Sequence, residues 1–159
     1  MSFFIDIQSE FFVSGLCIVG ILICIYAIDI EKSGAKKTQY KRICDVNESM
    51  SCTLVLTSKY GHMAKLLFNL SENSILNKSN AEYGLLFYIG MLLLSLLPST
   101  IIPYHSQLFF LGTLSSVLAS LGLAWILYAK LRNFCLICVT MYFINSLLLI
   151  SSIADLVNN

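Results

Sequence analysis

Four long apolar stretches are the feature of this sequence that most constrains its fold. A helix needs about 20 mostly apolar residues to cross the hydrocarbon core of a membrane. Apolar stretches of about this length run over residues 11–28, 83–102, 107–129 and 134–154. Hydrophobic residues make up 57% of the 159 residues and charged residues only 12%, and a small soluble domain could not bury so much apolar surface. The sequence therefore predicts an all-α integral membrane protein, a bundle of four transmembrane helices.

The first apolar stretch could also be the core of a cleaved signal peptide. Such peptides begin with basic residues and have an apolar run of about 7–15 residues. This chain instead has Asp6 and Glu10 before a longer apolar run, so we expect the stretch to persist as a membrane span. The net charge of +1 gives no reason to expect nucleic acid as a partner, because nucleic-acid binding needs a basic face.

Four spans place both termini on one side of the membrane and two connections on the other side. These connections are the loop over residues 29–82 and the turn over residues 130–133. Within the loop, apolar residues recur at the i, i+3, i+4 and i+7 spacing of a helix, at Met63, Leu66, Leu67 and Leu70. This spacing predicts a short amphipathic helix at the membrane interface. We expect residues 1–159 to form one membrane domain.

Several polar and small residues in the spans have structural interpretations. The third apolar stretch is rich in small residues, namely Gly112, Ser115, Ser116, Ala119, Ser120 and Gly122. Small residues let helix backbones approach closely in a membrane, so we expect this face to pack against another helix. Asn145 is expected to form a hydrogen bond between helices, and Cys17 and Cys24 to pack as small hydrophobes. His62 and His105 are expected at the surface or the interface.

The other four cysteines form two pairs on the same side of the membrane. Cys44 and Cys52 lie in the long loop, and Cys135 and Cys138 form a Cys-x-x-Cys motif at the start of the fourth stretch. A zinc site is disfavoured because one pair has a seven-residue gap and the other is embedded in a span. A structural disulfide in the loop would leave the Cys-x-x-Cys motif unexplained. The pattern favours redox chemistry.

The position of the Cys-x-x-Cys motif has chemical consequences. Asn133 is expected to cap the fourth helix, which places Cys135 in its first turn. There the helix dipole and the neighbouring Lys130 and Arg132 favour a thiolate. Cys138 lies one turn deeper, and a dithiol that faces the bilayer interior suits a lipid-soluble quinone. The loop pair faces water and suits thiol–disulfide exchange with a soluble protein.

Short motifs accompany the four cysteines in a fixed order. They are Cys44-Asp45-Val46, Cys52, Ser74-Ile75-Leu76-Asn77, Ser79-Asn80, Gly84, Phe87-Tyr88, Leu123-Ala124-Trp125-Ile126-Leu127, Phe134-Cys135, Cys138 and Tyr142. Together they resemble the vitamin K epoxide reductase family over roughly residues 17–150. This resemblance implies a four-helix bundle in the endoplasmic reticulum that reduces vitamin K epoxide and vitamin K quinone.

The resemblance also implies roles for the cysteines. Cys138 would attack the substrate and Cys135 would resolve the adduct. Cys44 and Cys52 would form a shuttle pair in which Cys52 reaches Cys135. The implied disulfides are Cys44–Cys52 and Cys135–Cys138, and the implied electron donor is a luminal thioredoxin-like thiol oxidoreductase.

A substrate site follows from the same resemblance. Asn80 and Tyr142 would hydrogen-bond the oxygens of the substrate, and Phe87, Tyr88 and Leu123 would line the pocket for its ring. A few polar groups in a mostly apolar pocket suit such a ligand. Vitamin K is then a substrate, with membrane lipids around it and no tightly bound cofactor or metal.

Charge and redox chemistry disagree about the orientation in the membrane. All ten Lys and Arg residues lie on the side that carries the two cysteine pairs, and the positive-inside rule assigns that side to the cytosol. The resemblance and the persistence of disulfides assign it to the lumen. Three glycosylation triplets also lie in the loop, at Asn47, Asn69 and Asn77. We expect the active site to face the lumen and both termini the cytosol.

Two other functions remain open at this point. A quinone-dependent oxidase that makes disulfides in luminal proteins would use the same cysteines with the opposite net flow of electrons. A non-enzymatic four-span scaffold would use a loop disulfide to shape a protein-binding surface. Such a scaffold has no need of Cys135 and Cys138.

Overall fold

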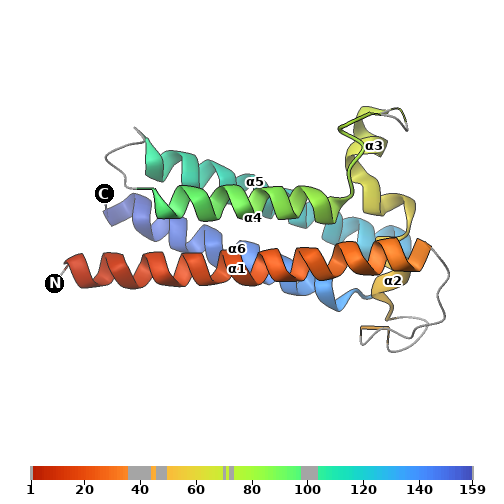
Figure 1. The fold of residues 1–159 in the computed structure, drawn as a ribbon, viewed down its shortest axis with the longest axis horizontal. Helices are drawn as coiled ribbons and strands as arrows, with labels where there is room; N and C mark the ends of the chain where they lie inside the picture. The colour runs from red at the N-terminus through yellow and green to blue at the C-terminus, as the bar shows by residue number, and fades with distance from the viewer. Residues whose placement is uncertain are drawn as a thin grey trace.

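The fold is a bundle of four long helices with short helices at one end (Figure 1). The computed structural model describes residues 2–35, 44–45, 50–69, 71, 74–97 and 104–158. The long helices are α1 (Ser2–Ala35), α4 (Asn80–Leu96), α5 (His105–Ile126) and α6 (Leu136–Asn158). The start of α1 and the end of α6 lie at one end of the bundle, and α2 and α3 lie at the other (Figure 1). We call the latter the loop end.

The loop end contains three short helical segments, and α5 ends in an irregular turn. The short segments are α2 (Cys52–Leu56), a 3-10 turn (Lys59–His62) and α3 (Met63–Phe68). A π-helical turn (Leu127–Leu131) follows α5 directly. The helix α3 agrees with the helical spacing predicted in the loop. Its position at a membrane interface stays a prediction, and Leu70 lies outside the described residues.

Helix α4 has a strong N-terminal signal in the sequence. The Ser79 hydroxyl accepts a hydrogen bond from the Glu82 amide at 3.2 Å, and the Glu82 carboxylate accepts one from the Ser79 amide at 3.0 Å. Each side chain satisfies a backbone donor that would otherwise lack a partner, as in a capping box. The helix therefore begins at Asn80, which fixes where that side chain points at the loop end.

Among the described residues, three helices are long and apolar enough to cross a membrane, over Glu10–Gly34, His105–Leu131 and Leu136–Val157. The helices predicted for these three spans are confirmed. The apolar helix α4 has 17 residues, which is about 26 Å at 1.5 Å per residue and shorter than a hydrocarbon core of about 30 Å. The end of the predicted second span, at 98–102, lies outside the described residues. That α4 crosses the membrane stays a prediction.

The helices pack as two main pairs, α1 with α4 and α5 with α6, and α1 also packs on α6. The core between them includes Cys17 and Cys24, whose side chains are 0% and 1% exposed, which confirms their predicted packing role. Gly20 of α1 is needed for this packing, because a Cβ atom there would lie 2.6 Å from the Tyr88 ring of α4. The glycine lets the tyrosine ring approach the helix backbone.

Polar side chains join the helices inside the bundle. Asn145 of α6 accepts a hydrogen bond from the Tyr88 hydroxyl at 2.6 Å and donates one to the Ser120 hydroxyl at 2.8 Å. Thr113 and Ser152 form a second link, between α5 and α6, at 2.8 Å. The predicted role of Asn145 in bonding between helices is confirmed. Such bonds leave few polar groups unsatisfied in an apolar interior.

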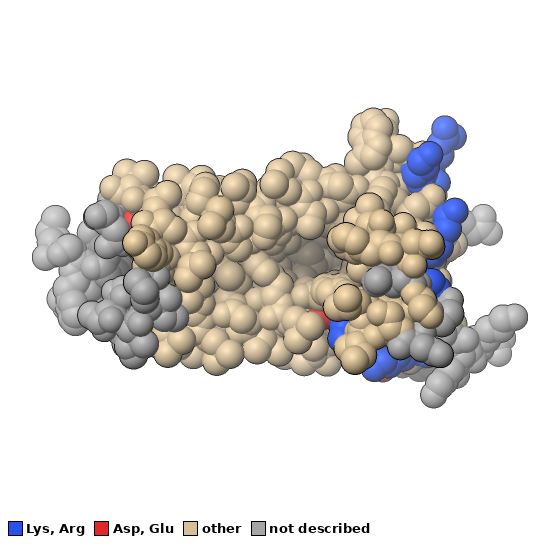
Figure 2. All heavy atoms as spheres, turned by 90° about the horizontal axis from the view of Figure 1, so that it is seen from above, with Lys and Arg blue, Asp and Glu red and all other residues tan. Residues whose placement is uncertain are grey.

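The positive charges of the described residues gather at the loop end. Figure 2 shows the Lys and Arg side chains at that end of the molecule. They are Lys32, Lys59, Lys65, Lys78, Lys130 and Arg132. The two histidines are only half-buried, and each contacts another element. His105 lies 2.8 Å from the Leu94 carbonyl oxygen at the far end, and His62 lies near Glu31 at the loop end.

Candidate active site

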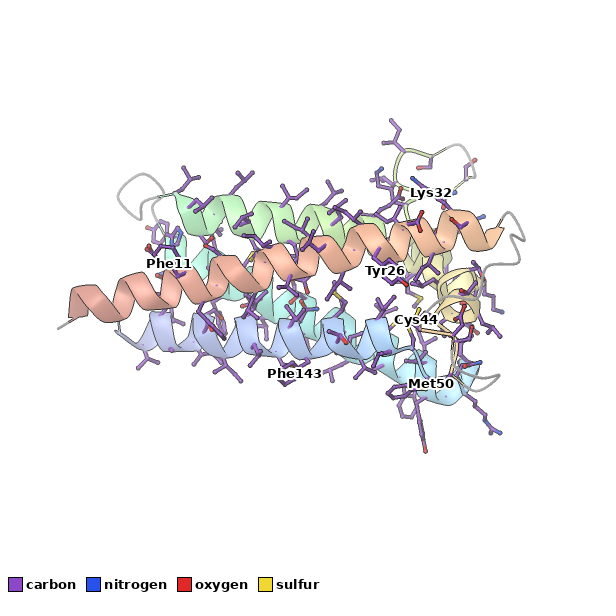
Figure 3. The ribbon with its side chains drawn as sticks, turned by 60° about the horizontal axis from the view of Figure 1, so that its bottom comes forward. Phe11, Tyr26, Lys32, Cys44, Met50 and Phe143 are labelled. Carbon is purple, nitrogen blue, oxygen red and sulfur yellow. The ribbon has the colours of Figure 1, made fainter. Side chains whose placement is uncertain are left out.

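A short piece of paired backbone holds the long loop against the start of α6. Met50 and Phe134 form an isolated parallel β-bridge. Cys52 follows Met50 by two residues and Cys135 follows Phe134 by one, so the bridge aligns the two cysteine-bearing segments. Figure 3 shows Cys44 and Met50 at the loop end, close to each other. The four cysteines that are distant in sequence therefore meet in one place.

The Asp45 carboxylate fixes the loop pair of cysteines. It accepts hydrogen bonds from the Ser51 hydroxyl at 2.8 Å, from the Thr53 amide at 3.0 Å and from the Thr53 hydroxyl. Burial opposes ionisation of this carboxyl, but these hydrogen bonds outweigh burial and lower the pKa of Asp45. The charged form is thus stabilised. This clamp places Cys44 next to Cys52 at the start of α2.

The four thiols form a continuous row of hydrogen bonds. The Cys44 thiol contacts the Cys52 thiol, Cys52 contacts Cys135, and Cys135 contacts Cys138. The Cys52 sulfur also donates to the Cys44 carbonyl oxygen at 3.7 Å. The first three cysteines are 5%, 0% and 0% exposed, whereas Cys138 is half-buried, so the prediction that the loop pair faces water is wrong in this structure. The row begins in the loop and ends at Cys138 on α6.

These contacts raise the pKa of three of the thiols. Burial, followed by the hydrogen-bond contact with Cys52, raises the pKa of Cys44 to about 12. The contact with Cys135, followed by burial, raises the pKa of Cys52. The contact with Cys138 is the main reason that the pKa of Cys135 rises to about 12. Burial and a hydrogen bond to the neutral form both favour the protonated thiol.

The structure corrects two predictions about the start of α6. Asn133 does not cap the helix, which begins at Leu136. Cys135 takes that position: its carbonyl accepts from the Val139 amide at 3.1 Å, and its sulfur accepts from the Cys138 amide at 3.3 Å. The prediction that the helix dipole and nearby cations favour a thiolate at Cys135 is also wrong in this state. The hydrogen-bond contact with Cys138 and burial raise the pKa of Cys135, and they outweigh the contacts with Cys52 and with the Cys138 amide, which lower it.

Amide groups at the start of α6 contact two sulfurs of the row. The Cys138 amide donates to the Cys135 sulfur, and the Ile137 amide donates to the Cys52 sulfur. These amides belong to the first turn of the helix, where backbone donors have no partner within the helix. Both contacts favour negative charge on sulfur. They hold Cys52 and Cys135 side by side at the helix terminus.

An apolar cavity of about 630 Å³ begins where the row of thiols ends. All four long helices contribute to its wall, and α2, the 3-10 turn and α3 close its loop end. Figure 2 shows a hollow in the surface between the long helices and the loop-end elements. Cys138 is the cysteine of the row that lines this cavity, so a ligand inside it meets the last thiol.

Tyr142 lines the same cavity, one helical turn beyond Cys138. Residues four apart lie on one face of a helix, so both side chains come from one stripe of α6. Among the described residues the Tyr142 hydroxyl has no hydrogen-bond partner. Its neighbour Phe143 is 64% exposed and points away from the bundle (Figure 3). The tyrosine hydroxyl is therefore available to a ligand.

Asn80 lines the cavity but already has two backbone partners. Its side-chain amide donates to the Tyr60 carbonyl at 2.7 Å, and its side-chain oxygen accepts from the Met63 amide at 3.1 Å. An asparagine side chain has two N–H groups and two acceptor sites, so one of each remains for a ligand. Asn80 also attaches the loop-end elements to α4, a structural role that the sequence did not predict.

The residues predicted to surround a substrate ring all lie in the cavity wall. They are Phe87, Tyr88 and Leu123. Phe87 and Tyr88 pack edge to face, with their ring centroids 5.2 Å apart. The Tyr88 hydroxyl is occupied by Asn145, so Tyr88 presents mainly its ring to the cavity. The structure thus brings together the nine residues that the sequence singled out for this site.

Comparison with known proteins agrees with this arrangement. A family model described as the vitamin K epoxide reductase family matches residues 11–153. The chain belongs to this family. Vitamin K epoxide reductase complex subunit 1 of Rattus norvegicus is 38% identical over 138 residues, 86% of this chain and 84% of that protein. Its Mus musculus counterpart is 38% identical over 131 residues, 82% and 80% of the two chains.

In this vitamin K epoxide reductase family member, the small residues of α5 serve a purpose that the sequence analysis missed. Ser115, Ser116, Ala119, Ser120 and Gly122 line the cavity. A Cβ atom at Gly122 would have nothing within 4 Å, so the helix has open space at this residue. The predicted close packing is found at two other positions: Ser120 is buried against Asn145 of α6, and a Cβ atom at Gly112 would lie 3.0 Å from the Met91 sulfur.

The six cysteines of this family member are all free thiols in the structure. The row therefore corresponds to the fully reduced form, in which every adjacent pair of thiols is in hydrogen-bond contact. The disulfides Cys44–Cys52 and Cys135–Cys138 belong to oxidised forms and stay predictions. The same contacts also allow exchange between Cys52 and Cys135.

Replacing Asp45 by asparagine should loosen Cys44 from Cys52. The change removes the charge that strengthens three hydrogen bonds. Because Asp45 is half-exposed, we expect this to destabilise the closed loop by about 1 kcal/mol. The loop around Cys44 should then open about fivefold more often. Pulse alkylation of the reduced protein, read by mass spectrometry, should show Cys44 reacting about fivefold faster. Unchanged labelling of Cys44 would contradict the clamp, and labelling of the core residue Cys17 serves as the control.

The pH dependence of this clamp has a definite sign. Because the pKa of Asp45 is lowered on folding, its contribution to stability is fully present above the ordinary aspartate pKa of about 3.9. That contribution is lost only as the pH falls through the lower pKa of the folded protein. Cys44 in the wild type should therefore stay protected from about pH 5 upwards.

Proposed function

We propose that this protein reduces vitamin K epoxide and vitamin K quinone with electrons that pass through its two cysteine pairs. The observation that carries the proposal is the row of four thiols that ends in an apolar cavity. The names of the rat and mouse relatives favour the reductase direction over a disulfide-generating oxidase. A scaffold would need neither the row nor the cavity.

The cavity has the size and lining for a quinone ring. Its volume of about 630 Å³ lies within the range of about 300–1,000 Å³ typical of small-molecule sites. Phe87, Tyr88 and Leu123 supply apolar contacts, while Asn80 and Tyr142 supply hydrogen bonds to the two ring oxygens. Vitamin K binds as a substrate and leaves as a product, so no tightly bound cofactor is required.

The proposed reaction joins one thiol pair to the substrate. The Cys138 thiolate attacks an epoxide carbon, and the C–O bond breaks to give an alkoxide that takes a proton. Cys135 then attacks the Cys138 sulfur, and the C–S bond electrons return to the substrate. Loss of hydroxide, protonated to water, gives the quinone and a Cys135–Cys138 disulfide. A quinone reduced by the same pair accepts two electrons and two protons to give the hydroquinone.

The loop pair then restores the reduced site. Cys52 attacks the Cys135 sulfur and releases the Cys138 thiolate, and Cys44 attacks Cys52 to release Cys135. The resulting Cys44–Cys52 disulfide is reduced by a luminal thioredoxin-like thiol oxidoreductase. Hydrogen-bond contact between each adjacent pair of thiols supports this order, because disulfide exchange requires the attacking sulfur next to the sulfur it attacks.

The proposed location is the endoplasmic reticulum membrane, with the loop end in the lumen and both termini in the cytosol. An oxidising lumen lets the loop disulfide persist. The cations at the loop end oppose this orientation by the positive-inside rule.

Cytosolic termini can be tested with intact microsomes. A protease added from outside should remove a tag fused to the C-terminus, because that tag faces the cytosol. Protection of that tag until detergent is added would contradict the proposed orientation.

A direct assay tests the activity. The protein purified in detergent should convert vitamin K epoxide to the quinone when dithiothreitol is the reductant, and a chromatographic assay of both compounds measures it. Cys17→Ala is the matched control, because Cys17 is a buried thiol outside the row. It should retain activity. Absence of turnover in folded wild-type protein would contradict the proposed function.

A further inference from the structure

Residues 59–68 form a lid over the loop end of the cavity. This lid segment comprises the 3-10 turn and α3. It contributes six cavity-lining residues, Tyr60, Gly61, Met63, Ala64, Leu67 and Phe68. The segment supplies a large apolar part of the wall, yet it contains no residue of the thiol row. Contacts that hold the lid in place therefore affect how tightly a ligand binds in the cavity and how easily it enters.

Two polar attachments connect the lid to the long helices. Asn80 of α4 bonds to the backbone of Tyr60 and of Met63. His62 lies between those two residues, and its Nε2 atom is 3.4 Å from the Oε1 atom of Glu31 on α1. The contact is an ion pair when the imidazole is protonated. The Glu31 side chain is only 17% exposed. Water therefore screens this contact less than it screens an ordinary surface ion pair.

Neither Glu31 nor His62 is part of the cavity wall. The pair connects the lid to the last turns of α1, whereas Asn80 connects it to α4. The sequence offered only a lone histidine in a loop and an acidic residue at a helix end, with no signal that joined them. Their contact exists because the 3-10 turn brings His62 against α1.

We infer that Glu31 and His62 are positioning residues that hold the lid closed over the bound substrate. The inference rests on the proposed function only for the identity of the ligand. When the contact is lost, the lid opens more often and supplies fewer apolar contacts to the ring. Cys138 and Tyr142 lie on α6 and keep their places. The pair therefore sets substrate affinity and access, while the chemical step is unaffected.

Access to Cys138 measures the lid without any turnover. The reduced wild-type protein, Glu31→Gln and His62→Gln are pulsed with N-ethylmaleimide, and mass spectrometry quantifies each cysteine peptide. Both variants should label Cys138 about two- to fivefold faster than the wild type, the range expected for one partly exposed ion pair. Cys17, in the bundle core, should label at an unchanged rate.

Two further variants separate the pair from a general loss of charge or fold. Glu10→Gln removes an acidic residue from the other end of α1 and should leave Cys138 labelling as in the wild type. The double variant Glu31→Gln/His62→Gln should match the single variants, because residues that act through one contact are not additive. The exchanged pair Glu31→Lys/His62→Glu should restore slow labelling.

Kinetics with vitamin K epoxide provide the second readout. Both single variants should raise KM about two- to fivefold with kcat within about twofold of the wild type, because only binding is affected. Unchanged Cys138 labelling, faster labelling of Cys17 as well, or a loss confined to kcat would each overturn the inference. A wild type that reduces no epoxide while the variants still label faster refutes the proposed function and leaves the lid inference standing.

Discussion

Replacing Cys135 or Cys138 by alanine is expected to abolish epoxide reduction driven by dithiothreitol, whereas replacing Cys44 or Cys52 should leave much of it. Cys138 is the thiol of the row that lines the cavity, and Cys135 contacts it directly. A small dithiol can enter and reduce this pair without the loop. The measurement is the rate of epoxide conversion by each purified variant under identical reductant.

A protein reductant should reverse the result for the loop pair. A thioredoxin-like protein is too large to enter the cavity and must exchange with the loop, so Cys44→Ala and Cys52→Ala should then lose activity. Cys17→Ala serves as a control, because this buried thiol lies outside both the row and the cavity wall. An equal loss in all four variants with dithiothreitol, in proteins that remain folded, would rule out the shuttle role of the loop pair.

The helices were predictable because each depends on a local pattern, whereas the substrate-site residues came from the family resemblance. Hydropathy over about 20 residues marks three spans clearly, since each of these helices is long and continuous. The fourth was harder, because α4 ends at Leu96 and the apolar pattern continues beyond it. The cysteine pairs were recognisable from their spacing, and the structure brings the two pairs together at the loop end.

The state of Cys135 could not be predicted from its sequence neighbours. A position near a helix N-terminus and beside cations favours a thiolate, but the largest effect on the pKa of Cys135 is its hydrogen-bond contact with Cys138, which raises it. The contact with Cys52 from a distant loop lowers that pKa and is outweighed. The same holds for Asp45, whose partners lie six and eight residues away across the turn of the loop.

Small residues on a membrane helix have two structural uses that look alike in sequence. Gly112 serves close packing, since Met91 fills the space that a side chain would occupy. Ser116 and Ala119 border the cavity, where small side chains leave room for a ligand. Only the position of the facing helix distinguishes these uses, and α4 and α5 diverge enough for a cavity to lie between them.

Tyr142→Phe is expected to lower kcat/KM for epoxide reduction by about one to three orders of magnitude. Opening the epoxide or reducing the quinone places negative charge on an oxygen, and the Tyr142 hydroxyl is the free donor in the cavity closest in sequence to Cys138. A hydrogen bond aimed at developing charge in a dry site contributes about 2.7–4 kcal/mol. The phenylalanine ring preserves packing, so thermal stability in detergent should change little.

Two further variants are needed to interpret the result for Tyr142→Phe. Asn145→Ala breaks the links to Tyr88 and Ser120 and should mainly lower stability. Asn80→Ala should lower kcat/KM as Tyr142→Phe does if both side chains bind the same ligand. It should also speed the labelling of Cys138 by N-ethylmaleimide, because the lid loses its bonds to α4. Tyr142→Phe should leave that labelling unchanged, since Tyr142 does not hold the lid. Wild-type turnover in Tyr142→Phe would show that its hydroxyl does not act on the substrate, and the proposed orientation of the ring would then be wrong.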